Sequence, residues 1–290
     1  MSVSQPHSGR AGRSHSEGVL RVLFGVLLAF VAVALTILAT PVPFALVTVL
    51  MVAFGAHEWH RMVRSPAQAA ASQRPVVIQT TITTITTACV VAAILFRVLP
   101  LAFVFLVIGT IVSFEWARRQ GDNPVWHAAG VMYLVLPCMA LVCLRVFPLQ
   151  GALTVLGLFL IVWATDTGAL VFGKLIGGKK LAPKLSPGKT WAGTIGGSVT
   201  AMVVFGLYIA LFGFNAVSAM LFAFVFSFVA HAGDLFESLV KRRFGYKDSG
   251  GLIPGHGGVL DRVDSLFAAS VVLALLVFGL HFNPMFGGRA

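Results

Sequence analysis

The sequence predicts an all-α polytopic membrane protein with about nine transmembrane helices. Only 11% of its 290 residues are charged and 58% are hydrophobic, whereas a soluble domain carries about 25% charged residues. Apolar runs of about 20 residues, the length that crosses a bilayer as a helix, recur along the whole chain. The basic residues between these runs are distributed as expected for loops on alternating sides of a membrane.

The apolar runs place the expected spans in order. They are residues 19–39, 41–58, 76–96, 100–115, 127–147, 152–172, 192–212, 216–233 and 265–282. The first run is longer than the core of a usual signal peptide and "TPVP" leads straight into the second, so we expect a retained helix. The second and fourth are the shortest, with purely apolar parts of about 15 residues. The third contains "TTITTITTA", whose threonines can bond to carbonyls of their own helix. The last four flank the polar segments described below.

The Lys and Arg residues give the orientation, because cytoplasmic loops near span ends collect them. With nine spans and a cytoplasmic amino terminus, all but three of the 21 basic residues fall on the cytoplasmic side, the exceptions being Arg97, Arg145 and Arg289. The carboxyl terminus is then on the opposite side. The net charge of +11 faces anionic lipid headgroups at one surface. Because the basic residues are scattered between spans, we expect no nucleic-acid binding.

Polarity divides the chain into parts. Residues 1–18 are polar, rich in Ser, Gly and His, and expected to be disordered. We expect about five N-terminal transmembrane helices over 19–150 and a C-terminal catalytic transmembrane domain over 151–290, with cytoplasmic loops at 173–191 and 234–264. Half of the ten acidic residues lie in the second loop. Chemistry is therefore expected there.

The acidic residues of this segment are spaced to share helix faces. Asp234, Glu237 and Ser238 stand at i, i+3 and i+4 on a helix leaving the membrane. Asp261 and Asp264 share a face of the helix that re-enters it. Two helix ends that carry carboxylates at one depth can converge on Mg²⁺, which prefers carboxylate oxygens and bridges to substrate phosphates. The alternative is that these acids only neutralise neighbouring Lys and Arg side chains, but ionisable groups at membrane depth are usually functional.

Two further segments have the composition of phosphate-binding elements. The stretch "KDSGGLIPGHGGVLDRVD", residues 247–264, contains glycines that let backbone N–H groups form an anion-binding nest. "SPGKT", residues 186–190, offers a lysine and two hydroxyl groups at the start of a span, where helix N-termini favour anions. It lacks the spacing of a Walker A loop. Asp166, near the cytoplasmic end of the sixth span, is either a packing acid or part of the same site.

One motif points elsewhere. "HEWH", residues 57–60, is similar to the zinc motif H-E-x-x-H of metalloproteases, but its histidines are three rather than four residues apart. We therefore expect interfacial residues at the end of a helix here, not the metal site of an intramembrane protease.

With these segments in view, a family resemblance is specific. "SLVKRRFGYKDSGGLIPGHGGVLDRVD", residues 238–264, resembles the signature of phosphatidate cytidylyltransferases, also called CDP-diacylglycerol synthases. The upstream elements "GDLFES", "DTGA" and "SPGKT" are similar to further family motifs in the same order, so the resemblance covers residues 160–270. One position departs from the family pattern: this chain has Ala192 in "KTWAG", where family members usually have Glu.

The resemblance implies that CTP reacts with phosphatidate to give CDP-diacylglycerol and pyrophosphate, with Mg²⁺ and a second cation such as K⁺. The implied metal ligands are Asp234, Asp261 and Asp264. The implied catalytic residues are Asp234, Asp261, Lys241, Arg242 and Lys189, and the implied substrate-binding residues are Ser186, Thr190, Ser238, Lys247, His256, Gly257, Gly258, Arg262 and Asp166. The resemblance also implies a homodimer in the bacterial cytoplasmic membrane with its active site facing the cytoplasm.

The expected chemistry needs alignment and charge neutralisation more than covalent catalysis. The second pKa of a phosphomonoester is about 6, so the lipid phosphate is largely dianionic at neutral pH and needs no strong general base. Metal ions and basic side chains bring the two polyanions together. The alternatives are a CTP-dependent transferase acting on a polyprenol or ether-lipid phosphate, an ion-coupled membrane transporter, and a non-catalytic scaffold. Charges gathered at one interface, rather than at the midplane, argue against the transporter.

Overall fold

Eight long apolar helices dominate the part of the chain that the structure describes, and each is long and apolar enough to cross a membrane. The structure, a computed structural model, describes residues 25, 27, 29–65, 68, 72–251, 257–286 and 288–289. The helices are α2 (Pro41–Met62), α4 (Arg74–Leu95), α5 (Leu99–Arg119), α6 (Pro124–Val146), α7 (Gly151–Leu175), α8 (Trp191–Ala210), α9 (Ala216–Arg243) and α10 (Leu260–Ala274), which η1 (Leu275–Gly279) continues. Two antiparallel strand pairs accompany them, β1 (Lys180–Ala182) with β2 (Ser186–Thr190) and β3 (Phe282–Asn283) with β4 (Gly288–Arg289). The predicted all-α polytopic membrane class is confirmed.

The helices follow the predicted spans, with differences at their ends. Of the first predicted span, residues 29–37 are helical, while residues 19–24 and the tail 1–18 lie outside the described part of the chain. The span predicted at 216–233 continues as α9 to Arg243, because its last turns contain good helix formers such as Leu, Glu, Lys and Arg. The last helix begins at Leu260 rather than at 265. The side of the membrane on which each end lies stays a prediction.

Proline starts four of the helices, and a side-chain cap starts α8. α2, α4, α5 and α6 each have Pro in the first turn, where the missing N–H costs nothing. At the start of α8, the Thr190 hydroxyl accepts a hydrogen bond from Gly193 N at 3.0 Å. Because Thr190 is also the last residue of β2, this cap ties the hairpin directly to α8.

Two hydrophobic cores lie on either side of α10. One core is built largely from α7, α8 and α9 and takes up Leu266, Ala269 and Leu273 of α10. The other is built largely from α2, α4, α5 and α6 and takes up Leu260, Val263 and Phe267 of the same helix. α10 thus buries opposite faces in the two cores and fixes them relative to each other.

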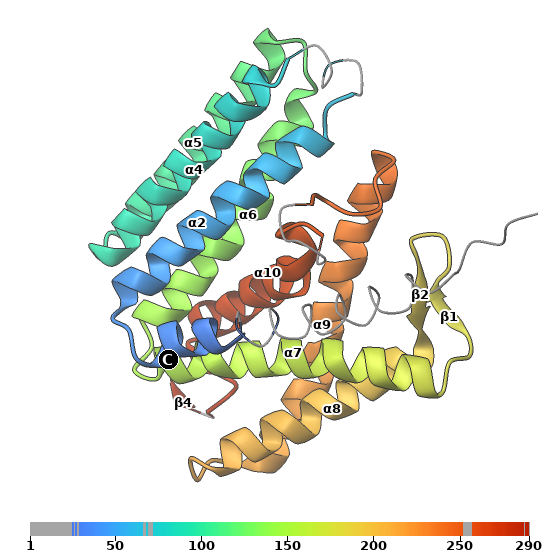
Figure 1. Ribbon diagram of the computed structural model, residues 1–290. Coiled ribbons are helices and arrows are strands. Elements are labelled where there is room, and N and C mark those ends of the chain that lie inside the picture. The colour runs from blue at the N-terminus through green and yellow to red at the C-terminus, as the bar shows by residue number, and fades with distance from the viewer. Residues whose placement is uncertain are drawn as a thin grey trace, which may run out of the picture.

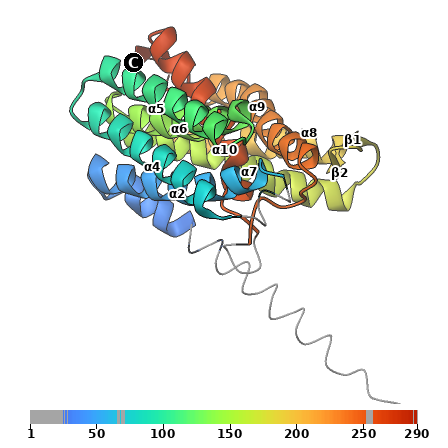
Figure 2. The ribbon, with the colours of Figure 1, turned by 90° about the horizontal axis from the view of Figure 1, so that it is seen from above.

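Figure 1 shows how this packing arranges the helices in space. α2, α4, α5 and α6 lie alongside one another, and α7 and α8 cross beneath them at a steep angle. The β1–β2 hairpin stands beyond the carboxyl end of α7, and α9 and α10 lie between the two groups of helices. Figure 2, seen from above, shows the same layering, with the hairpin at the edge of the molecule near α8.

Glycines bring α7 and α8 into backbone contact. A Cβ added to Gly197 would lie 3.1 Å from Ala169 N, and one added to Gly168 would lie 3.0 Å from Gly197 Cα. Small residues of this kind allow close approach of helices in a membrane. The close contact fixes the carboxyl end of α7 beside the start of α8, and the hairpin connects these two ends.

Replacing Gly197 by Val is expected to destabilise the fold by about 1–3 kcal/mol, because the new side chain would overpack against the α7 backbone. The measurement is the midpoint of thermal unfolding in detergent micelles. The matched control is Ala210→Val, which adds bulk at an exposed position of the same helix. Equal midpoints for the two variants would contradict the close contact of α7 and α8.

Candidate active site

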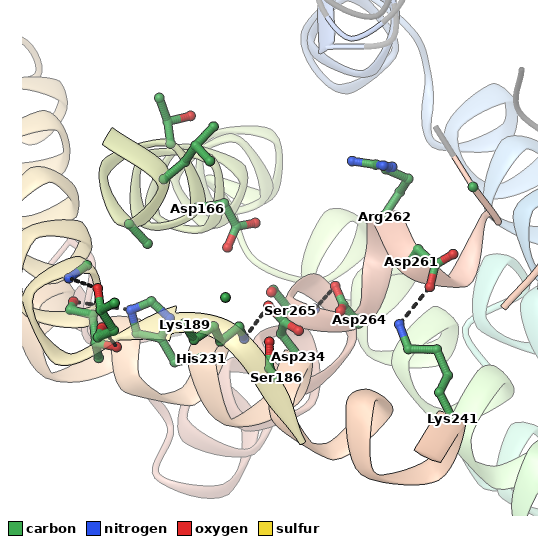
Figure 3. Close-up of a pocket in the computed structure, with 18 of the residues that line it drawn as sticks. Asp166, Ser186, Lys189, His231, Asp234, Lys241, Asp261, Arg262, Asp264 and Ser265 are labelled. Carbon is green, nitrogen blue, oxygen red and sulfur yellow. Dashed lines mark hydrogen bonds and ion pairs between the residues drawn. The ribbon is translucent and has the colours of Figure 1, made fainter. Parts of the chain in front are cut away.

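A cavity of about 950 Å³ opens between the carboxyl end of α7, the hairpin, the charged turns of α9 and the start of α10. Figure 3 shows that its labelled side chains come from all of these elements and face a common space. Most of the predicted site residues line it: Asp166, Ser186, Lys189, Thr190, Asp234, Lys241, Lys247, Gly257, Asp261, Arg262 and Asp264. Segments separated by almost a hundred positions in the chain are thus gathered at one site.

The remaining predicted residues lie close to this cavity or outside the described residues. Ser238 donates a hydrogen bond to Asp234 Oδ1 at 3.4 Å. Arg242 Nε donates to the Leu185 carbonyl oxygen at 3.3 Å, which ties the end of α9 to the hairpin. Gly258 N donates to Asp261 Oδ2 at 2.9 Å. His256 lies outside the described part of the chain.

Lysine–aspartate pairs neutralise charge within the cavity. Lys189, at the end of β2, forms an ion pair with Asp234 of α9. Lys241 Nζ lies 2.6 Å from Asp261 Oδ1 and 3.1 Å from Glu237 Oε1. Each lysine therefore joins two different elements. Each pair also places a cation beside an anion, and a ligand made of a metal ion and phosphate groups needs both, the anion for the metal and the cation for the phosphates.

The Asp261 carboxylate is held by backbone donors as well as by Lys241. Ser249 N lies 3.2 and 3.1 Å from its two oxygens, and Gly258 N donates to Oδ2. Gly257, just before, has φ of +80°, a left-handed conformation that glycine adopts without steric cost. The glycine-rich segment therefore turns its N–H groups towards an aspartate in this structure, at the place where the sequence predicts an anion-binding nest.

Asp166, Asp234 and Asp264 come from α7, α9 and α10 and line the same cavity (Figure 3). The last two helices approach closely because α9 has Gly233 at the crossing: a Cβ there would lie 2.7 Å from Asp264 O. A larger residue would separate the helices and with them the two carboxylates.

The donor set around the cavity fits a hard divalent cation. Carboxylate oxygens from several helices surround it, and Mg²⁺ prefers such oxygens. Among the described residues, no group of three His, Cys, Asp or Glu side chains is gathered closely enough to hold a metal ion. Mg²⁺ is usually held by one or two carboxylates, several waters and substrate phosphates, so such a site needs no three-carboxylate cluster within the protein.

The cavity also has polar residues that sequence reasoning did not select. They include Thr167, Thr194, His231, Asp248 and Ser265. His231 Nε2 lies 3.2 Å from the Thr194 carbonyl oxygen, which joins α9 to α8. His231 could have been chosen from the sequence, since it stands one helical turn before Asp234.

One side of the cavity reaches the apolar outer surface. Leu170 lines it and is 57% exposed, and Ala169 lies beside it. A hydrocarbon chain could lie against this surface while a phosphate group contacted the charged interior. The cavity therefore has charged and polar side chains inside and the apolar side chains of Ala169 and Leu170, which we call its apolar rim, at one edge.

The "HEWH" motif lies at the end of a helix, as predicted, and two of its side chains have buried partners. Its residues lie in the last turns of α2, as expected, but Glu58 and His60 are buried inside the helical bundle. His60 Nδ1 lies 2.9 Å from His127 Nδ1, and His60 Nε2 lies 2.8 Å from Thr83 Oγ1. Glu58 instead contacts the segment that leads into α10, a contact that sequence reasoning missed.

Comparisons with known proteins show which family the chain is related to. A sequence model of the cytidylyltransferase family matches residues 19–280. A phosphatidate cytidylyltransferase of Brucella suis biovar 1 is 45% identical over 186 residues, which cover 61% of this chain and 65% of that protein. Proteins of the same name are 38% identical over 191 residues in Rickettsia bellii (63% of this chain, 82% of that protein) and 38% identical over 187 residues in Pseudomonas aeruginosa (62% and 69%).

The two kinds of match cover different lengths of sequence. The match to the Brucella protein spans less than two thirds of that protein's length. The family model, in contrast, covers most of this chain and includes every element around the cavity. The chain therefore belongs to the cytidylyltransferase family.

Proposed function

We propose that this protein is a phosphatidate cytidylyltransferase, which converts CTP and phosphatidate into CDP-diacylglycerol and pyrophosphate. The observation that carries the proposal is that the predicted aspartates and basic residues meet at one cavity, beside an exposed apolar side chain. The names of the relatives support the same reaction. Family membership argues against the alternative of an ion-coupled transporter.

The charges of the cavity suit a metal–nucleotide complex. The basic side chains Lys189, Lys241, Lys247 and Arg262 line the same space as the aspartates. Phosphate groups favour such cations, and carboxylates favour the metal that accompanies the nucleotide. The cavity therefore offers cations for the phosphate groups and carboxylates for the metal ion.

The reaction that we propose is an in-line displacement. The lipid phosphate, largely dianionic at neutral pH, attacks the α-phosphorus of CTP, and pyrophosphate leaves. Asp234, Asp261 and Asp264 are the candidate ligands of Mg²⁺; one or two of them would hold the ion together with water and substrate phosphates, and it would supply charge neutralisation on the phosphates. Lys189 and Lys241 would bind phosphate oxygens and keep the two polyanions aligned, so that positioning and electrostatics supply the rate enhancement.

Exposed lysines near the hairpin support a proposed orientation in the membrane. Lys174, Lys179, Lys180 and Lys184 are exposed in or next to the hairpin, which also supplies Lys189 to the cavity, and basic residues collect on the cytoplasmic side. We therefore place the cavity at the cytoplasmic surface, where CTP reaches it from water and the lipid enters from the leaflet. A homodimer and a second cation such as K⁺ are proposed from the family resemblance alone.

Purified protein in detergent is expected to transfer labelled CMP from CTP to phosphatidate in the presence of Mg²⁺ and to lose this activity with EDTA. Asp261→Asn is expected to lower the rate about a hundredfold or more, because the variant lacks a carboxylate charge that would hold the metal. The rate of labelled lipid formation is the measurement.

Glu115→Gln is the control for this experiment, because Glu115 is partly exposed and pairs only with Arg118 of the same helix among the described ion pairs. Its rate should equal that of the wild type. Absence of product from folded wild type would contradict the phosphatidate assignment. Product formed with a polyprenol or ether-lipid phosphate instead would identify a different lipid substrate.

Lys189→Gln is expected to raise the KM for CTP and lower the rate about a hundredfold, since a cation at the cavity is lost. The matched control is Lys184→Gln, which removes the same charge from an exposed position of the same hairpin. Steady-state kinetics with varied CTP measure both variants. Equal kinetics for the two would exclude Lys189 from phosphate binding.

A further inference from the structure

Glu58 of α2 is a buried carboxylate that contacts the catalytic segment from the other half of the chain. It is 5% exposed and accepts three hydrogen bonds, from Ser249 Oγ at 2.9 Å, Val259 N at 2.9 Å and Leu260 N at 3.0 Å. These donors lie 191 to 202 positions further along the chain. Since the two backbone donors are at the start of α10, the carboxylate caps that helix and interacts favourably with its dipole.

Two glycines of the signature segment make room for this carboxylate. A Cβ added to Gly250 would lie 2.6 Å from Glu58 Oε1, and one added to Gly258 would lie 2.5 Å from Glu58 Oε2. Both distances are shorter than side chains tolerate. These glycines therefore fit the segment around a protein carboxylate, in addition to any part they have in binding phosphates.

α2 and α10 also pack closely at Gly55, one helical turn before Glu58 on α2. A Cβ added to Gly55 would lie 3.0 Å from Leu260 Cδ2 and 3.2 Å from Leu134 Cδ2. Gly55 and Glu58 are three residues apart and share a face of α2. The first residue of α10 is thus held both by packing and by the carboxylate.

Glu58 and Asp261 hold the same segment from two sides. Ser249 donates its hydroxyl to Glu58 and its backbone N–H to Asp261. At the other end, Gly258 N donates to Asp261, while Val259 N and Leu260 N donate to Glu58. Both ends of the segment 249–260 are therefore fixed by two carboxylates, and Ser249 connects one carboxylate to the other.

The cap on α10 differs from an ordinary helix cap. The side chain that caps a helix usually belongs to the residue at the helix start. In α10 this N-cap residue is Val259, whose side chain makes no capping hydrogen bond. The cap comes instead from another helix and shares Ser249 with an aspartate of the cavity. Movement of Glu58 would displace Ser249 and the first turn of α10, and with them Asp261.

We propose that Glu58 is a positioning residue of the transferase: it fixes both ends of the segment 249–260 and thereby sets the position of Asp261 in the cavity. The proposal rests on the proposed function, because Asp261 is taken as a metal ligand of that reaction. Groups that orient metal ligands typically contribute a factor of about 10 to 100 in activity or metal affinity.

The test is Glu58→Gln, which keeps the size of the side chain but replaces one acceptor oxygen by an NH₂ group that faces backbone donors. The rate at saturating substrate is expected to fall about 10- to 100-fold, and the Mg²⁺ concentration for half-maximal activity to rise, with an unchanged KM for phosphatidate. Hydrogen exchange measured by mass spectrometry should become faster in peptides covering 257–264 and stay unchanged in α7 and α8.

Controls separate positioning from stability. Glu115→Gln should match the wild type in rate, Mg²⁺ requirement and exchange. Ser249→Ala removes one of the three hydrogen bonds and should give a smaller effect of the same kind, so it tests the proposal even where Glu58→Gln fails to fold. Exchange needs no turnover, so inactive wild type would contradict the proposed function while the exchange result still tested the contact.

Two outcomes would overturn the proposal. Wild-type rate, Mg²⁺ requirement and exchange in Glu58→Gln and Ser249→Ala would show that the carboxylate does not position this segment. Faster exchange throughout both cores, with an Mg²⁺ requirement equal to that of the wild type, would show that Glu58 contributes only to stability.

Discussion

The packing of α10 between two groups of helices is the interaction on which the site depends. One face of this helix is buried in the core built largely from α7, α8 and α9, and the other in the core built largely from α2, α4, α5 and α6; its direct helix neighbours are α9, α6, α7 and α2. Its first turns carry Asp261 and Asp264 into the cavity. Because burial on both faces allows only small shifts of a packed helix, the position of these carboxylates is fixed by the whole bundle and not by the local loop alone.

Charge balance is the second constraint on this region. An isolated charge is expensive in an apolar environment, and each ionic group near the membrane needs a partner. Lys189 and Lys241 meet this need by pairing with aspartates on other elements. The same pairs hold the hairpin, α9 and α10 together, so residues proposed for phosphate and metal binding also stabilise the arrangement of the cavity.

Much of the fold could be predicted, because the length and spacing of apolar runs report membrane helices directly. The start of α10 and the end of α9 were less predictable, since helix continues into polar residues where hydropathy falls. The residues around the cavity were largely found because spacing on one helix face and the family motifs are local features. Glu58 was not found: its partners lie about two hundred positions away, and an isolated acid in an apolar helix does not reveal what it contacts.

The length of α9 has a consequence for the lipids around the protein. Its 28 residues extend over about 42 Å, whereas the hydrocarbon layer of a bilayer is about 30 Å thick. At 1.5 Å per residue, Asp234 lies about 27 Å and Lys241 about 38 Å from the start of the helix, so a helix that spans such a layer would place Asp234 near its edge and Lys241 beyond it. A thicker or thinner bilayer would tilt the helix or deform the membrane. Hydrophobic mismatch would thus change the position of the cavity relative to the plane of the lipid phosphates.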